Sequence, residues 1–152
     1  MNDKQLYSDL ETLKHISEVR DNIWRMVMEL LRRAGDHDKS KLESPEREIF
    51  GEHTEKLGKV EYGSQEYKDL LELVKPAILN HYSKNRHHPE HFAKGVNDFD
   101  LIDLMEMLCD WIAATKRNKN GNIHKSIEIN KEKYGLPEML VNILNNTVNR
   151  YF

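Results

Sequence analysis

Residues 80–91 form the densest group of side chains able to bind metals or move protons. They read NHYSKNRHHPEH and hold four of the eight histidines of the chain. Imidazole together with carboxylate suits Zn, Fe, Mn, Ni or Co, and a surface loop has no need of so many histidines. Lys84 and Arg86 lie in the same segment and could bind phosphate or another anion. The segment therefore predicts a metal site with an anion-binding side.

A second candidate is the dipeptide His37-Asp38, in the polar stretch GDHDKSK at 35–41. It follows a long predicted helix, and the irregular backbone of a helix–loop junction lets adjacent side chains point at one ion. A plain polar loop is the alternative. His15 lies 22 residues earlier. It could meet this pair only if the first helix packs back or bends.

The third candidate is a stripe of carboxylates on a predicted helix at 101–117. Asp103, Glu106 and Asp110 are spaced i, i+3 and i+7, which places them on one face. Apolar residues surround the rest of this helix, so we expect it to be central and buried. Buried carboxylates are costly to desolvate and repel one another. Either cations from neighbouring helices or a bound metal must compensate, unless the stripe faces water.

The elements that must position these residues are helices joined by short polar loops. Ser44, Ser64 and Asp100 are expected N-caps, and Pro76 should kink its helix or split it in two. No alternating run of β-branched residues predicts a sheet, so the fold class is all-α, a compact multi-helix bundle. The expected helices cover about 3–13, 15–34, 45–57, 65–85, 101–117, 123–133 and 137–150.

Composition limits the alternatives. The 152 residues suit a single domain, 1–152, and the net charge of -3 gives no basic field for nucleic acid. Cys109 is the only cysteine, which excludes an internal disulfide and fits a reducing, cytoplasmic setting. We interpret Cys109 as a core residue beside Asp110. The N-terminus has no signal-peptide pattern, and no window approaches the roughly 20 apolar residues of a membrane helix.

Taken in order, these motifs resemble the HD-domain superfamily of metal-dependent phosphohydrolases over about residues 10–117. The run HDKSK at 37–41 resembles the family form H-D-x-[GS]-K, and LCDWIAA at 108–114 resembles its late helix with a ligand aspartate. The chain is also similar to a small uncharacterised HD-like family of phages and bacteria, in which the runs N-R-H-H-P-E-H-F and E-M-L-C-D-W-x-A-A recur.

The resemblance implies an HD-type bundle with one or two divalent metals, whose identity (Mn, Fe, Ni, Co or Zn) stays open. A first metal would be bound by His15, His37, Asp38 and Asp110. A second would be bound by His81 and one of His87 and His88, with Asp38 bridging. Residues 122–152 would be packing helices. Leu136, Leu140, Ile143 and Leu144 are typical of either core packing or a homodimer interface.

The activity implied is hydrolysis of a phosphomonoester or phosphodiester, in a nucleotide or related small molecule, by metal-activated water. Asp38, Lys41 and Glu106 are the expected catalytic residues. Lys41, with Arg86 and Lys84, would neutralise the phosphate oxygens. Glu106 would orient a ligand histidine or water. The alternatives are an interhelical salt bridge for Glu106 and a solvated loop for Lys41.

Departures from the family leave the substrate open. Lys41 stands where the bacterial deoxynucleoside monophosphatase branch has a glutamate, and the Gly-Tyr-Pro motif of the cyclic-dinucleotide phosphodiesterases is absent. Two other functions fit the same residues: a di-iron oxygenase of the inositol-oxygenase type, and a non-catalytic binding module stabilised by metal. We assign no role to His53, His91 or His124.

Overall fold

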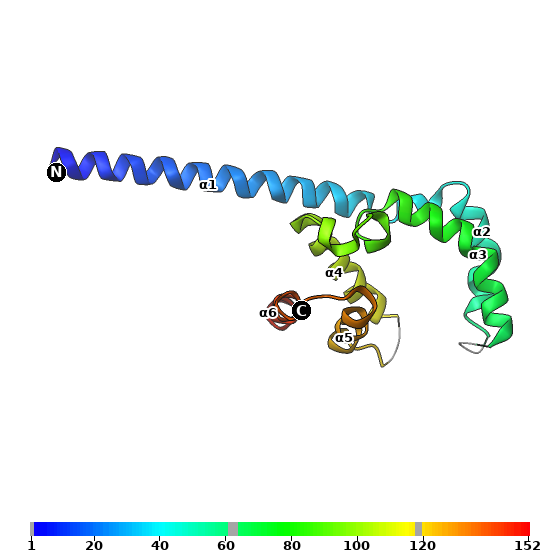
Figure 1. Ribbon diagram of the computed structural model, residues 1–152. Helices are drawn as coiled ribbons and strands as arrows, with labels where there is room; N and C mark the ends of the chain where they lie inside the picture. Colours follow the sequence, from blue (N-terminus) through cyan, green and yellow to red (C-terminus); the bar gives the residue numbers. More distant parts are fainter. Residues whose placement is uncertain (1, 61–63, 118–119) are drawn as a thin grey trace. The chain divides into compact units, whose positions relative to one another are not determined.

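The computed structural model describes residues 2–60, 64–117 and 120–152, and over these residues it contains helices and no strand (Figure 1). The predicted all-α class is confirmed. Among the described residues, no helix is long and apolar enough to cross a membrane. The α-helices are α1 (Asp3–Asp36), α2 (Glu46–Leu57), α3 (Gln65–Lys84), α4 (Leu101–Thr115), α5 (Ile123–Tyr134) and α6 (Glu138–Tyr151). Short 3-10 helices cover Lys39–Leu42 (η1), Pro89–His91 (η2) and Gly95–Asp98 (η3).

The chain divides into two units, Met1–Asp36 and His37–Phe152. The first is helix α1, which we expected as two helices with a break near residue 14. The break does not occur, because no glycine or proline precedes Gly35 and the residues around Lys14 favour a helix. At 1.5 Å per residue, α1 is about 51 Å long. The second unit holds every predicted site residue except His15.

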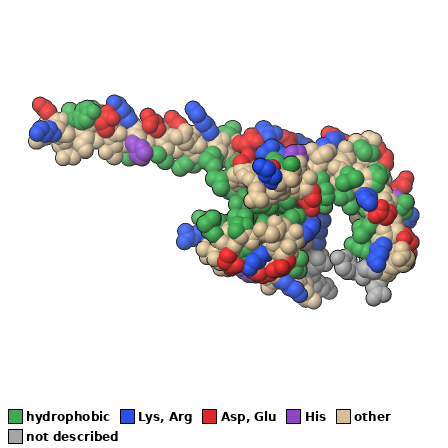
Figure 2. Space-filling model, in the orientation of Figure 1, with side chains coloured by type: hydrophobic (Ala, Val, Ile, Leu, Met, Phe, Trp, Pro, Cys, Tyr) green, Lys and Arg blue, Asp and Glu red, His purple; other side chains and the backbone are tan. Residues whose placement is uncertain are grey.

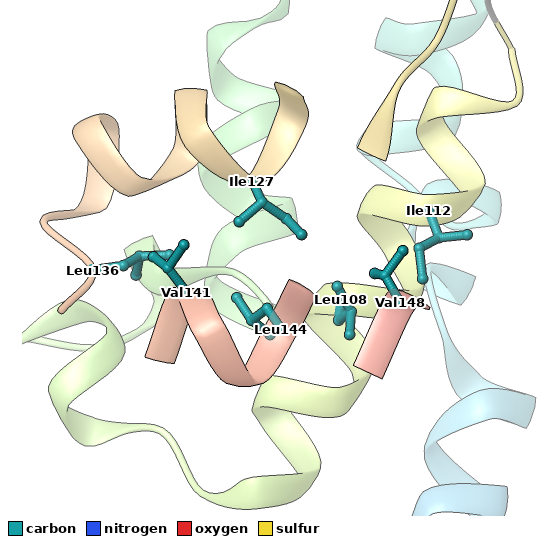
Figure 3. Packing of buried hydrophobic residues seen from close by; sticks show 7 residues of the cluster. All are labelled: Leu108, Ile112, Ile127, Leu136, Val141, Leu144 and Val148. Carbon is teal, nitrogen blue, oxygen red and sulfur yellow. The ribbon is translucent and has the colours of Figure 1, made fainter. Parts of the chain in front are cut away.

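The core of the second unit lies between α4, α5 and α6 (Figure 3). The sequence left open whether Leu136 and Leu144 are core or homodimer-interface residues. Both are core residues, and Leu140 packs against the same core. Ile143 is exposed instead. The buried members of this core are Leu108, Ile112, Ile127, Leu136, Val141, Leu144 and Val148.

Local signals explain most helix boundaries. The Asp100 carboxylate accepts from the backbone N–H groups of Ile102 and Asp103, and Ser64 accepts from that of Tyr67, so both predicted caps are confirmed. The Ser44 cap is wrong, because α2 begins at Glu46 without a side-chain cap. Pro76 does not split α3. Packing of α3 against α2 supports the helix where the proline removes one backbone hydrogen bond.

Helix α4 is not buried all round as we expected. Asp103 and Glu106 are buried, while Leu101, Met105 and Cys109 are exposed. The interpretation of Cys109 as a core residue is therefore wrong. The reason is that the carboxylate stripe faces His37 and the histidine-bearing loop, while the side with Leu108 and Ile112 packs against α5 and α6. Cys109 lies on neither of these two sides.

Candidate metal centre

Side chains from three parts of the second unit converge on one place. His37 and Asp38 come from the turn before η1, and His81 lies in the last turn of α3. His87 and His88 come from the loop between α3 and η2, and Asp110 comes from α4. Two groups have ligand atoms within 4.8 Å of one another: Asp38, His81, His87 and His88 in one, and His37, His87 and Asp110 in the other. His87 belongs to both groups.

Asp38 reaches this place through an unusual backbone conformation. Its φ of 58° lies in the left-handed region, where it is the only described residue other than glycine. Such a conformation costs about 1–2 kcal/mol for most residues, although aspartate and asparagine tolerate it best. The turn directs the carboxylate towards His81, whose Nε2 lies 3.2 Å from Asp38 Oδ1. Strain of this kind is often retained where a side chain must be held in place.

Glu106 orients two of the histidines. Its Oε1 lies 2.8 Å from His37 Nδ1 and 3.1 Å from His87 Nδ1. Since a carboxylate only accepts hydrogen bonds, His37 Nδ1 carries the proton and donates, while His87 Nδ1 lies within ion-pair distance of the same oxygen. The Nε2 atoms are then left for the centre, where those of His37 and His87 lie 3.7 and 3.6 Å from oxygens of Asp38. Glu106 was expected either to form an interhelical salt bridge or to orient a histidine of the site, and the geometry agrees with the second interpretation.

Glu46 orients His81 in the same way, and no sequence pattern predicted this role. The residue is fully buried at the start of α2, with Oε2 2.9 Å from His81 Nδ1. Ser40 Oγ and Asn80 Nδ2 also donate to this carboxylate. In sequence, Glu46 is only an acid in the first turn of a helix, a common feature with no link to His81.

The donor set fits a metal ion. Asp38 Oδ1 and His87 Nε2 are buried and have no hydrogen-bond partner within the described structure. They lie 3.6 Å apart, and His81 Nε2 lies 2.9 Å from His88 Nε2. Ligands about 2.1 Å from one ion must lie within about 4.2 Å of each other. Neutral imidazoles held by carboxylates are a common arrangement in metal proteins.

The charges of these groups are strongly coupled. Interactions with Asp110 and Glu106 raise the pKa of His37 to about 10, against the effect of its burial. Burial opposes the charged form of Asp38, but the adjacent His81 and Lys41 hold its pKa well below the usual range. Burial and the neighbouring imidazoles lower the pKa of His88 to about 3. Near neutral pH the centre thus combines an ionised carboxylate, a neutral imidazole and one protonated histidine.

The carboxylate stripe of α4 is compensated in two ways. Glu106 and Asp110 contact histidines of the centre, whereas Asp103 is paired with a cation. Arg86 Nε lies 3.0 Å and Nη2 2.8 Å from the two oxygens of the fully buried Asp103. The guanidinium also lies over the ring of Phe92. Arg86, predicted to bind substrate, therefore links the histidine loop to α4.

A cavity of about 440 Å³ opens beside the centre and is lined by Asp38, His81 and His88. Among the described residues, two cations line it: the predicted Lys41, which donates to Asp38 Oδ2, and Arg117, which we did not predict. The remaining lining residues are Phe50, Thr54, Ile78 and Tyr82. Lys84 is not among them, and its Nζ lies 3.8 Å from Glu43. Arg117 stands among other basic residues directly after α4, so only its position in the fold reveals it.

Four histidines lie outside both ligand groups. His15 is exposed on α1, in the other unit, about 31 Å along the helix from Asp36. Its role as a ligand stays a prediction. Of the three histidines with no assigned role, His91 Nδ1 donates to the carbonyl of Tyr82, which fastens the histidine loop to α3. His124 contacts Asn145, and His53 lies near Glu52.

The structure thus defines a helical protein with a histidine–carboxylate centre of the kind that binds metals. A family model described as a family of unknown function (DUF5662) matches residues 4–150, and the chain belongs to this family. No curated protein and no solved structure matches the chain.

Proposed function

We propose that the chain is a metal-dependent phosphohydrolase of the HD-domain type. Its substrate would be a nucleotide or a related small phosphomonoester or phosphodiester. The observation that carries the proposal is the placement of an unpartnered carboxylate oxygen and imidazole nitrogen, on Asp38 and His87, beside a cavity with two cations. A centre saturated by protein ligands would leave no such opening, so the cavity favours catalysis over a purely stabilising metal.

Two groups of ligands would hold the ions, one around Asp38 and His81 and one around His37 and Asp110, with His87 between them. When bound, a divalent ion such as Mn, Fe, Ni, Co or Zn supplies a Lewis acid and an acidified water. Its identity is for elemental analysis to decide. The reducing setting indicated by a single cysteine makes the cytoplasm the proposed location.

The remaining residues of the site have separate tasks. Lys41 and Arg117 would neutralise the phosphate oxygens at the mouth of the cavity. Phe50, Ile78 and Tyr82 form an apolar wall against which the organic part of the ester would lie. Glu46 and Glu106 would keep the imidazole nitrogens directed at the centre.

The test compares Asp38→Asn with Asp69→Asn, a matched change on an exposed aspartate of α3. Asparagine is chosen because it tolerates the left-handed backbone at position 38. The full chain is assayed with mononucleotides, cyclic nucleotides and a generic phosphodiester in the presence of Mn²⁺. We expect Asp38→Asn alone to lose hydrolysis and bound metal. Unchanged hydrolysis in this variant would refute the proposal.

Elemental analysis and spectroscopy of the same preparations separate the proposal from an oxygenase. Two irons per chain, an electron-spin signal and no hydrolysis of any phosphate ester would favour the inositol-oxygenase type of chemistry instead. A colourless protein that holds Mn, Ni or Zn and hydrolyses one of the esters would support the phosphohydrolase.

A further inference from the structure

Helix α1 carries an apolar band that its own unit does not cover. Six large apolar residues repeat with the seven-residue period of helices that pair along their length, while others, such as Leu10, Trp24 and Met28, lie off this seam. Asp9 and Arg20 are the polar exceptions at these seam positions, and Arg20 lies beside Asp21. The seam residues are Leu6, Leu13, Ile16, Ile23, Val27 and Leu30.

The exposure of this band is large. Leu13, Ile16 and Ile23 are 61%, 55% and 56% exposed, and apolar side chains recur among charged ones on the face of α1 in view (Figure 2). With six such side chains, most of them about half exposed, the band amounts to an apolar area on the order of 500 Å². A patch of this size is at the upper end for a monomer and often marks an interaction surface, and it would form the apolar part of one partner's share of a standard interface.

The polar side of α1 needs no partner. Its charged residues pair within the helix, as in Lys14 with Glu11 and Arg32 with both Glu29 and Asp36. The helix contains six basic and seven acidic residues, so it lacks the cationic face of a helix that binds anionic lipid or nucleic acid. The nearly balanced charge also allows two copies of the helix to approach without strong repulsion.

We infer that the apolar band of α1 pairs with α1 of a second copy of the chain, and that the two helices run antiparallel. Charge favours this direction. Residues 3–19 contain four acids and two bases, whereas residues 20–36 contain four bases and three acids. Antiparallel pairing places the more acidic half of one helix beside the more basic half of the other. With full overlap, the midpoint lies between Val19 and Arg20.

This inference stands apart from the proposed activity, and its test needs no substrate. Sedimentation of the full chain should give twice the monomer mass of 18.0 kDa. Ile16→Glu with Ile23→Glu places two charges in the seam and should give a monomer. The matched control, Ser8→Glu with Asn22→Glu, adds the same charge to the polar side and should stay dimeric. A monomeric parent protein, or a dimer that survives the seam variant, would overturn the inference.

Disulfide trapping checks the direction in a Cys109→Ser background, which removes the one natural thiol. Val19→Cys lies at the midpoint and should cross-link two copies when the helices are antiparallel. Leu6→Cys, near one end, joins two copies only when they are parallel. A cross-link through position 6 would contradict the antiparallel pair, whether or not position 19 also cross-links. Circular dichroism confirms that each variant retains its helix content.

Discussion

Replacing Glu106 by glutamine tests how the centre keeps its histidines oriented. The change preserves the shape of the side chain but removes the negative charge that receives the Nδ1–H group of His37 and lies 3.1 Å from His87 Nδ1. A hydrogen bond to a charged acceptor contributes about 1.5–3 kcal/mol, compared with about 0.5–1.5 kcal/mol for a neutral pair. Weakening the bond to His37 and the charge contact with His87 therefore costs about 2 kcal/mol.

We expect this cost to appear mainly in metal affinity, because the two rings become free to turn their Nε2 atoms away from Asp38 and Asp110. A cost of about 2 kcal/mol corresponds to about thirtyfold weaker binding. This agrees with the 10- to 100-fold losses typical of residues that orient metal ligands. The assay is titration of the full chain with Mn²⁺ or Zn²⁺ against a fluorescent chelator.

The effect should also depend on pH. Glu106 is one of the two main causes of the raised pKa of His37, which Asp110 supports most strongly. Without Glu106, fewer protons compete with the metal for His37 near neutral pH, and this partly offsets the loss. The deficit of Glu106→Gln should therefore be larger in alkaline than in neutral solution.

The matched control is Glu90→Gln, since Glu90 also accepts from charged and hydroxyl donors but lies outside both ligand groups. It should bind metal like the parent protein. NMR of the ring nitrogens gives an independent measurement, because a protonated Nδ1 atom on His37 is expected only with Glu106 intact. Unchanged affinity together with unchanged tautomers in Glu106→Gln would refute the reasoning.

Three further perturbations follow from the same contacts. Glu46→Gln turns an N–H of the new amide towards a hydrogen-bond donor. The free energy of unfolding, measured by urea denaturation, should fall by about 2–3 kcal/mol. Metal affinity, measured by titration, should fall at least tenfold. Arg86→Ala removes the guanidinium from the buried Asp103 and should lower the free energy of unfolding, measured by urea denaturation, by about 2–4 kcal/mol. The loss is smaller than for a fully buried ion pair because the arginine side chain is 44% exposed. His37, whose pKa is raised to about 10, is protonated at neutral pH and must lose its proton to bind metal. Calorimetry of metal binding in two buffers should therefore show about one proton released, and the metal affinity should rise with pH.

Each of these predictions has its own control. Glu48→Gln, on the exposed side of α2, should leave both measured quantities unchanged. For Arg86, a loss of hydrolysis without any loss of stability would show that it binds substrate, as first predicted, rather than linking the loop to α4. For His37, the His37→Asn variant should release no proton. Equal release from this variant and from the parent would assign the proton to another group.

Local chemistry made much of the fold predictable. Asp100 and Ser64 cap their helices because a short oxygen-bearing side chain can reach backbone N–H groups two or three residues on, and this depends on sequence alone. The i, i+3, i+7 spacing likewise placed Asp103, Glu106 and Asp110 on one face of α4. Of the seven metal ligands predicted from the sequence, the structure brings six together, and His15 is the exception.

Long-range packing decided the rest, because the partner of a buried charge is set by which elements meet. Nothing in sequence connects Glu46 with His81, 35 positions apart, or Arg117 with the cavity. The same spacing rule gave three carboxylates, yet packing assigned them different partners: Arg86 for Asp103, and histidines for Glu106 and Asp110. Residue type and spacing therefore determined which side chains could act, and tertiary structure determined what each one contacts.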